Sequence, residues 1–201
     1  MYMKENYNNL FKNEIANFDK KHSILLHSCC APCSSHVISV LKDYFDITIL
    51  YYNPNIFPYD EYLKRKEEQI KLINEIAKVN CVDIMDCDYD NECYEKLING
   101  LENEPERGKR CRVCYLMRLE KTAKLAKEND YDYFCTTLSV SPYKNSKWIN
   151  EFGKILENKY DVKWLYSDFK KKDGYKTSIL LSNKYNLYRQ NYCGCIYSKP
   201  Q

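Results

Sequence analysis

Glycine is scarce in this sequence, which has 201 residues and five glycines, at positions 100, 108, 153, 174 and 194. Neither G-x-G-x-x-G nor G-x-x-x-x-G-K-[ST] can be written from these positions. Both motifs need glycine because the backbone must approach phosphate groups closely. The scarcity therefore argues against a dinucleotide site of that kind and against a P-loop.

Long apolar runs are also missing. No stretch approaches the roughly 20 apolar residues that a membrane-spanning helix needs. The first 21 residues mix charged, amide and apolar side chains, without the apolar core of a signal peptide. We therefore expect a cytoplasmic protein without a membrane partner.

Cysteine, in contrast, is abundant, with 11 residues in the chain. An odd number without an export signal argues for metal binding or redox catalysis rather than a disulfide framework. Four cysteines stand alone in helical or strand-like stretches, and we expect them to pack as small apolar side chains. They are Cys81, Cys87, Cys93 and Cys135.

Helical and strand-like segments alternate along the whole chain. Strands are expected at 24–26, 47–52, 82–85, 133–138 and 162–166. Helices are expected near 10–18 and at 34–44, 59–78, 91–98, 111–128, 146–157 and 175–185. The pattern predicts a single α/β domain over residues 1–201, with a mostly parallel sheet and helices on both faces. In such sheets sites form at the carboxyl ends of strands, where the first cysteine cluster follows the apolar run 24–26.

Cys111 and Cys114 form a C-x-x-C at the start of a predicted helix. Side chains three residues apart share a helix face, and the helix N-terminus with the flanking Arg110 and Arg112 favours thiolates. Such a pair can be half of a zinc site, a redox pair, or two ligands of an iron–sulfur cluster.

Cys29 and Cys30 are adjacent, in a turn that follows a predicted strand. Adjacent cysteines in a turn can converge on different irons of one cluster, whereas a tetrahedral zinc is less naturally served by them. A [4Fe–4S] cluster takes four thiolates, and Cys29, Cys30, Cys111 and Cys114 supply them. The alternative is a zinc knot that joins two loops.

Cys193 and Cys195 flank Gly194 in a C-x-C. A disulfide between them would close a small, strained and therefore labile ring, as in a redox-active pair. The two thiols could instead ligate a second iron beside the cluster, together with Cys33. The sequence leaves both roles open.

The last third of the chain is basic. Residues 140–201 hold 12 Lys or Arg against 5 Asp or Glu, whereas the first 139 hold 19 against 23. Basic residues interleaved with tyrosines suit phosphate contacts and base stacking. The candidates for substrate binding are Tyr143, Lys144, Lys171, Tyr175 and Arg189. Asp168, which follows a predicted strand, is a candidate acid or metal ligand.

Several blocks of the sequence, in order, resemble the cobalamin-independent epoxyqueuosine reductase family, QueH. The resemblance extends from about Lys21 to Ser198. The blocks are Leu25–Cys33, Tyr52–Ile56, Lys109–Tyr115, Thr136–Leu138, Ser141–Lys144, Asp168–Lys171, Gly174–Tyr175 and Leu187–Cys195.

This resemblance implies the reduction of the epoxide of epoxyqueuosine, in the wobble position of a tRNA anticodon, to queuosine, which is the last step of queuosine synthesis. It implies a nucleotide-hydrolase-like fold (HUP, or Rossmann-like) and an external electron donor. The family's cluster ligands correspond to Cys29, Cys30, Cys111 and Cys114. Its C-terminal pair corresponds to Cys193 and Cys195, as a redox-active pair or as part of an adjacent mononuclear iron site.

Two other functions fit parts of the pattern. Adenylyl-sulfate reductases also combine a Cys-Cys pair with a distant C-x-x-C around a [4Fe–4S] cluster. A zinc-stabilised RNA-binding module without catalysis is the second alternative. The basic C-terminal third and the block Leu187–Cys195 favour the tRNA reductase.

Overall fold

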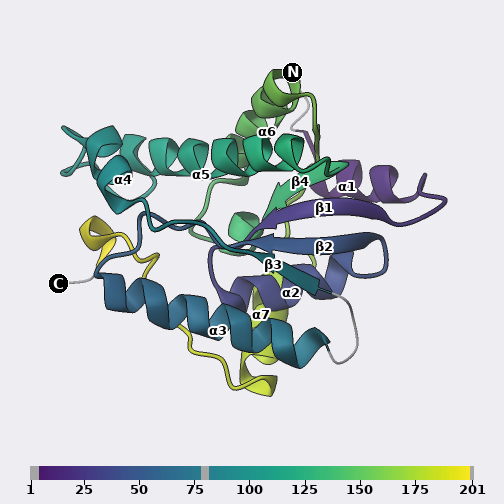
Figure 1. Cartoon of the computed structure of the whole chain (residues 1–201), viewed down its shortest axis with the longest axis horizontal. Coiled ribbons are helices and arrows are strands. Elements are labelled where there is room, and N and C mark those ends of the chain that lie inside the picture. The colour runs from purple at the N-terminus through teal and green to yellow at the C-terminus, as the bar shows by residue number, and fades with distance from the viewer. Residues whose placement is uncertain (1–4, 78–81, 200–201) are drawn as a thin grey trace.

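The computed structural model describes residues 5–77 and 82–199, and Figure 1 shows their arrangement. The strands are β1 (His22–His27), β2 (Phe45–Leu50), β3 (Val82–Met85), β4 (Tyr133–Thr136) and β5 (Lys163–Trp164). The helices are α1 (Tyr7–Ile15), α2 (Ala31–Leu41), α3 (Tyr59–Ala77), α4 (Asn91–Ile98), α5 (Lys109–Glu128), α6 (Ser146–Tyr160) and α7 (Gly174–Lys184). Two short 3₁₀ helices, η1 (Thr137–Val140) and η2 (Ile196–Ser198), follow β4 and the last cysteine.

The five strands form one sheet in the order β3-β2-β1-β4-β5, and every neighbouring pair is parallel. Helices α2, α3 and α7 cover one face, and α5 and α6 cover the other (Figure 1). The predicted α/β class, parallel sheet and helical layers are therefore confirmed. No helix in the described part of the chain is long and apolar enough to cross a bilayer.

The centre of the sheet is its most buried part. Ile24, Leu25 and Leu26 of β1 are fully buried, as expected for a strand with helices on both faces. The chain leaves β1 toward β2 on one side and returns to β4 on the other. This reversal makes the carboxyl ends of β1 and β4 the point where parallel sheets bind ligands.

Most element boundaries agree with those expected from the sequence, with two differences near the cysteines. Helix α2 begins at Ala31 rather than at residue 34, since Pro32 fits the first turn of a helix, where no backbone N–H is needed. Strand β4 ends at Thr136, and the residues after it turn into η1. Lys78, the last residue of the expected helix 59–78, and Cys81 lie outside the described residues.

Candidate active site

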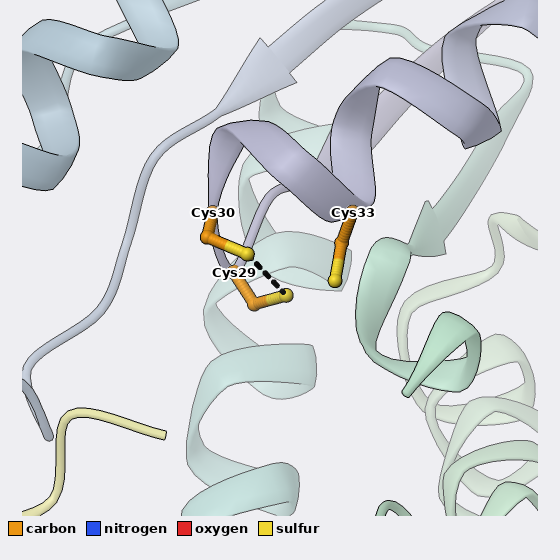
Figure 2. Close-up of side chains that lie close together, drawn as sticks. All are labelled: Cys29, Cys30 and Cys33. Carbon is orange, nitrogen blue, oxygen red and sulfur yellow. Dashed lines mark hydrogen bonds between the residues drawn. The ribbon is translucent and has the colours of Figure 1, made fainter. Parts of the chain in front are cut away.

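Three thiols gather where β1 leads into α2. The Sγ atoms of Cys29, Cys30 and Cys33, called the α2 thiols below, all lie within 4.8 Å of one another, and Figure 2 shows their side chains turned toward each other. The sulfurs of the adjacent Cys29 and Cys30 are 3.8 Å apart. The turn thus makes adjacent cysteines converge, as the sequence analysis expected, and adds Cys33 from the first turn of α2.

The start of α2 stabilises negative charge on these sulfurs. Cys30 is the N-cap of α2, in extended backbone conformation, and the positive end of the helix dipole lies there. Hydrogen bonds from Cys29 and then Cys33 lower the pKa of the Cys30 thiol well below its usual range. The Thr137 hydroxyl also donates to the Cys29 sulfur at 3.3 Å. Hydrogen bonding with Cys30 raises the pKa of the Cys29 thiol to about 12, and hydrogen bonding with Cys29 and Cys30 raises that of Cys33. The group therefore favours a single thiolate, on Cys30.

Four further cysteines lie on α5 and in the C-terminal segment, and we call them the α5/C-terminal thiols: Cys111, Cys114, Cys193 and Cys195. Cys114 and Cys195 are buried in one cluster with Tyr94 and Ile98, and Cys193 packs against it. The Cys111 sulfur accepts a hydrogen bond from the backbone N–H of Arg107 at 3.3 Å. All described cysteines are free thiols.

The C-x-C segment is held against the loop that follows β2. The N–H of Phe57 donates to the carbonyl of Gly194 at 3.0 Å, and Asn55 Nδ2 lies 3.5 Å from the carbonyl of Cys193. Gly194 has a φ of 99°, which a residue with a Cβ rarely adopts. The Tyr94 hydroxyl lies 3.2 Å from the Cys195 sulfur. These contacts fix where the two thiols point.

One cavity of about 450 Å³ contains sulfur from both thiol groups. Its wall includes all three α2 thiols and Cys193, whereas Cys111, Cys114 and Cys195 are not among the described residues that line it. Hydrogen bonding from Cys195, then the nearby charge of Lys144, lowers the pKa of the Cys193 thiol well below its usual range. The cavity therefore presents sulfur from both groups to whatever binds in it.

Four of the five predicted substrate-binding residues line the same cavity: Tyr143, Lys144, Tyr175 and Arg189. Tyr143 and Tyr175 are partly exposed and each ring lies beside a guanidinium, at 5.4 Å from Arg107 and 5.8 Å from Arg189. Lys144 is mostly buried and lies 3.5 Å from Glu106. Aromatic and cationic groups thus surround the opening above the thiols.

The other predicted site residues lie elsewhere. Lys171 and Asp168 are not among the described residues that line the cavity. The Asp168 carboxylate accepts a hydrogen bond from Lys170 Nζ at 2.8 Å. An acid–base or ligand role of Asp168 remains a prediction.

Several charged groups near the cysteine motifs have structural partners. Arg110 donates to the carbonyls of Leu101, Glu102, Glu104 and Tyr197. The guanidinium of Arg112 lies over the rings of Trp148 and Phe152. Burial lowers the pKa of His27 to about 3. Its neutral ring forms hydrogen bonds with the hydroxyl of Thr136 and the carbonyl of Tyr52.

The isolated cysteines fall into different environments. Cys135 in β4 is fully buried, as expected. Cys93 on α4 is exposed and Cys87 is half-buried, so the prediction of a packed thiol is wrong for Cys93. Cys93 lies on the solvent side of α4, whose buried residues are Tyr94 and Ile98.

Arg118 is a site residue that the sequence analysis missed. It lies on α5, one helical turn beyond Cys114, and lines the cavity. The spacing of four residues between Cys114 and Arg118 was the available signal, because such side chains share a helix face. Gln190, Asn191 and Tyr192 also line the cavity, next to the C-x-C.

The donors suit a metal centre built with soft ligands. Thiolates select zinc or iron–sulfur clusters over hard cations. The α2 thiols alone meet the spacing of a metal-binding group among the described residues. Cys111 and Cys114 share the first turns of α5, where the helix dipole favours thiolate, although burial raises the pKa of the Cys114 thiol above its usual value. The residues present therefore fit a thiolate-held centre.

The protein is therefore an α/β protein with a thiol-lined cavity at the switch point of its parallel sheet, a site suited to metal-thiolate or redox chemistry. The chain belongs to the family described as epoxyqueuosine reductase QueH, whose profile matches residues 24–201. It is thus an oxidoreductase of the queuosine biosynthesis type.

Relatives named epoxyqueuosine reductase QueH are similar to nearly the whole chain. The protein from Staphylococcus epidermidis is 43% identical over 202 residues, covering 97% of this chain and 85% of the relative. The one from Streptococcus pyogenes is 46% identical over 178 residues, covering 88% and 70%. The one from Acinetobacter baylyi is 40% identical over 182 residues, covering 90% and 82%.

Proposed function

We propose that this chain reduces the epoxide of epoxyqueuosine, carried in the wobble position of a tRNA anticodon, to the alkene of queuosine in the cytoplasm. The single observation that supports this most is the cavity that combines thiols with aromatic and cationic side chains. Sulfur centres supply redox chemistry, and the aromatic and cationic groups suit an RNA nucleotide. The family membership adds the identity of the substrate.

The proposed cluster ligands are Cys29, Cys30, Cys111 and Cys114. A [4Fe–4S] cluster bound there supplies electrons at low potential, one at a time. The Thr137 hydroxyl and the Arg107 N–H donate hydrogen bonds to two of these sulfurs. Hydrogen bonds of this kind tune the potential of thiolate-bound iron.

Epoxide removal consumes two electrons and two protons, breaks two C–O bonds, forms a C=C bond and releases water. The electrons come from an external donor. Cys193 and Cys195 are proposed to supply the second of the two electrons. They would do so either as a redox-active dithiol or, with Cys33, as ligands of an adjacent mononuclear iron. Cys193 faces the cavity.

The nucleotide is held by the rim of the cavity. The exposed rings of Tyr143 and Tyr175 offer stacking surfaces, and Arg189 and Lys144 offer positive charge beside them. Stacking on an aromatic ring contributes about 1–3 kcal/mol per base. Lys171, in the turn before α7, is proposed to contact the phosphate backbone outside the cavity. Asp168 is a candidate acid next to that turn.

The test is nucleoside analysis of tRNA from a strain that lacks this chain. We expect epoxyqueuosine to accumulate and queuosine to disappear, and a plasmid copy of the gene to reverse both changes. Normal queuosine in the deletion strain would contradict the proposal.

The two alternatives need separate assays with purified protein. An adenylyl-sulfate reductase would release sulfite from adenylyl sulfate, and we expect none. A zinc-stabilised RNA-binding module would contain zinc without sulfide and would bind tRNA without turnover. Either result would replace the proposed reductase.

A further inference from the structure

Arg118 is a buried cation in the wall of the thiol-lined cavity. It is 4% exposed and lines the cavity together with the α2 thiols and Cys193. Its Nε donates to the carbonyl of Cys114 at 3.2 Å, and one terminal nitrogen lies 3.4 Å from Asn53 Oδ1. These contacts orient the guanidinium, but both partners are neutral.

Two other buried cations, Arg65 and Lys144, have carboxylate partners. Arg65 lies 2.6 Å from Glu61, and Lys144 lies 3.5 Å from Glu106. Within residues 5–77 and 82–199, Arg118 forms no ion pair with an Asp or Glu. Burying an ion without a counter-charge is costly, and a fold keeps such an ion only where something compensates it.

Thiols of both groups lie near Arg118. Its Nε donates to the carbonyl of Cys114, which precedes it by one turn of α5. The cavity that Arg118 lines also contains all three α2 thiols and Cys193. The carboxylate of Glu106 in the same wall lies 3.5 Å from Lys144. Because thiols must lose their protons to bind a metal, a metal held by these cysteines would place negative charge beside Arg118.

We propose that Arg118 is the built-in counter-ion of the thiolate centre, a positioning residue whose charge allows both thiol groups to hold one anionic metal site. This inference rests on the proposed function in one respect, because it takes the centre to be a thiolate-bound metal cluster. It adds a residue that neither ligates the metal nor contacts it. Arg118 acts through the charge it places between the ligands.

Arg110 provides a matched control on the same helix. It is 1% exposed, two helical turns before Arg118, and it is as buried as Arg118. Its guanidinium donates hydrogen bonds to backbone carbonyls in residues 101–104 and in η2. These bonds hold both segments against α5. Replacing Arg110 removes structural hydrogen bonds, whereas replacing Arg118 removes the charge between the sulfurs.

The experiment compares the full-length wild type with Arg118→Met, Arg118→Lys and Arg110→Met. Each protein is reconstituted anaerobically with iron and sulfide. The rate of iron loss to a chelator and the reduction potential of the bound centre are then measured. Melting temperatures of the reduced, metal-free proteins are measured in parallel.

We expect Arg118→Met to lose iron about 10- to 100-fold faster than the wild type, the range seen when residues that support metal ligands are removed. Its potential should become more negative, because a neighbouring positive charge favours the reduced state. Arg118→Lys keeps the positive charge and should lose iron at close to the wild-type rate. Arg110→Met should melt lower but hold its iron like the wild type.

Iron retention and potential unchanged in Arg118→Met would overturn the inference. So would a loss in Arg118→Lys as large as in Arg118→Met, because hydrogen-bond geometry rather than charge would then matter. A metal-free Arg118→Met that melts as low as Arg110→Met would make Arg118 a structural residue. A wild type that takes up no iron and sulfide would instead contradict the proposed function itself.

Discussion

The two thiol groups are assembled in different ways. The α2 thiols come from five consecutive residues, 29–33, at the junction of β1 and α2, so the local turn brings their sulfurs within 4.8 Å. The α5/C-terminal thiols come from segments about eighty residues apart in the chain, α5 and residues 193–195. One group needs only a strand end and a helix start, whereas the other needs a docked C-terminal segment.

The two groups therefore differ in what holds their thiols in position. The α2 thiols need only the folded centre of the sheet and the start of α2. The position of Cys193 and Cys195 depends on hydrogen bonds to the loop after β2 and on the conformation of Gly194. A rigid ligand group and a separately held pair suit a centre in which one part stores electrons and the other meets the substrate.

The largest expected effect comes from removing one ligand of each group. Cys30→Ala and Cys114→Ala should both lose the cluster and lower turnover by more than about 100-fold, the upper limit for residues that only support ligands. Iron, acid-labile sulfide and tRNA turnover measure this. Cys93→Ala, on the exposed side of α4, is the control and should match the wild type. A Cys114→Ala protein that keeps its full iron and sulfide would mean that the α2 thiols hold the metal alone.

A smaller effect should come from Gly194→Ala. A Cβ there would lie 2.8 Å from Ile56 Cγ1 and 3.0 Å from Arg65 Nη1, at a backbone φ of 99°. The C-x-C must therefore shift, and a displacement of about 1 Å can lower turnover by about 100-fold. We expect the cluster to be retained, because its proposed ligands lie elsewhere.

Gly100→Ala is the matched control, since Gly100 has a φ of 82° and no atom within 4 Å of the added Cβ. Backbone strain alone costs about 1–2 kcal/mol at such a position. Its melting temperature should fall while its turnover stays near the wild-type value. Equal turnover in the two variants would show that the position of the C-x-C does not matter.

The smallest effects should come from the hydroxyl groups that contact one sulfur in each thiol group. Thr137→Val removes the donor to Cys29, and Tyr94→Phe removes the hydroxyl beside Cys195. A hydrogen bond to a sulfur contributes about 1 kcal/mol, so the expected shifts are on the order of tens of millivolts. Thr137→Val should make the cluster potential more negative in a redox titration, whereas Tyr94→Phe should leave it unchanged. A shift of the cluster potential in Tyr94→Phe alone would reverse this assignment.

The sequence predicted the sheet well for a physical reason. In a strand formed by an apolar run such as 24–26, side chains on both faces must be buried, which requires helices on both sides of the sheet. Glycine and proline mark turns and loops between the strands. The adjacent cysteines also predicted one contact of the site, because the turn after β1 brings the sulfurs of Cys29 and Cys30 to 3.8 Å. That Cys111 and Cys114 join them around one cluster stays a prediction.

Long-range packing decided the features that could not be predicted. The four-residue spacing puts Arg118 on the same face of α5 as Cys114, but only packing against segments far along the chain decides that this face lines the cavity. The sequence favoured Arg110 because it flanks the C-x-x-C, yet its hydrogen bonds go to backbone carbonyls. Asp168 follows β5, as expected from the sequence. Its carboxylate pairs with the ammonium group of Lys170, two residues further along the chain.

Two cysteines of each thiol group, Cys29 with Cys30 and Cys111 with Cys114, are proposed to hold one iron–sulfur centre. Measuring iron, acid-labile sulfide and zinc in the chain purified without oxygen decides whether they do. We expect iron and sulfide close to the content of one [4Fe–4S] cluster per chain, with zinc in trace amounts. Stoichiometric zinc without sulfide, in a protein that still folds, would contradict it.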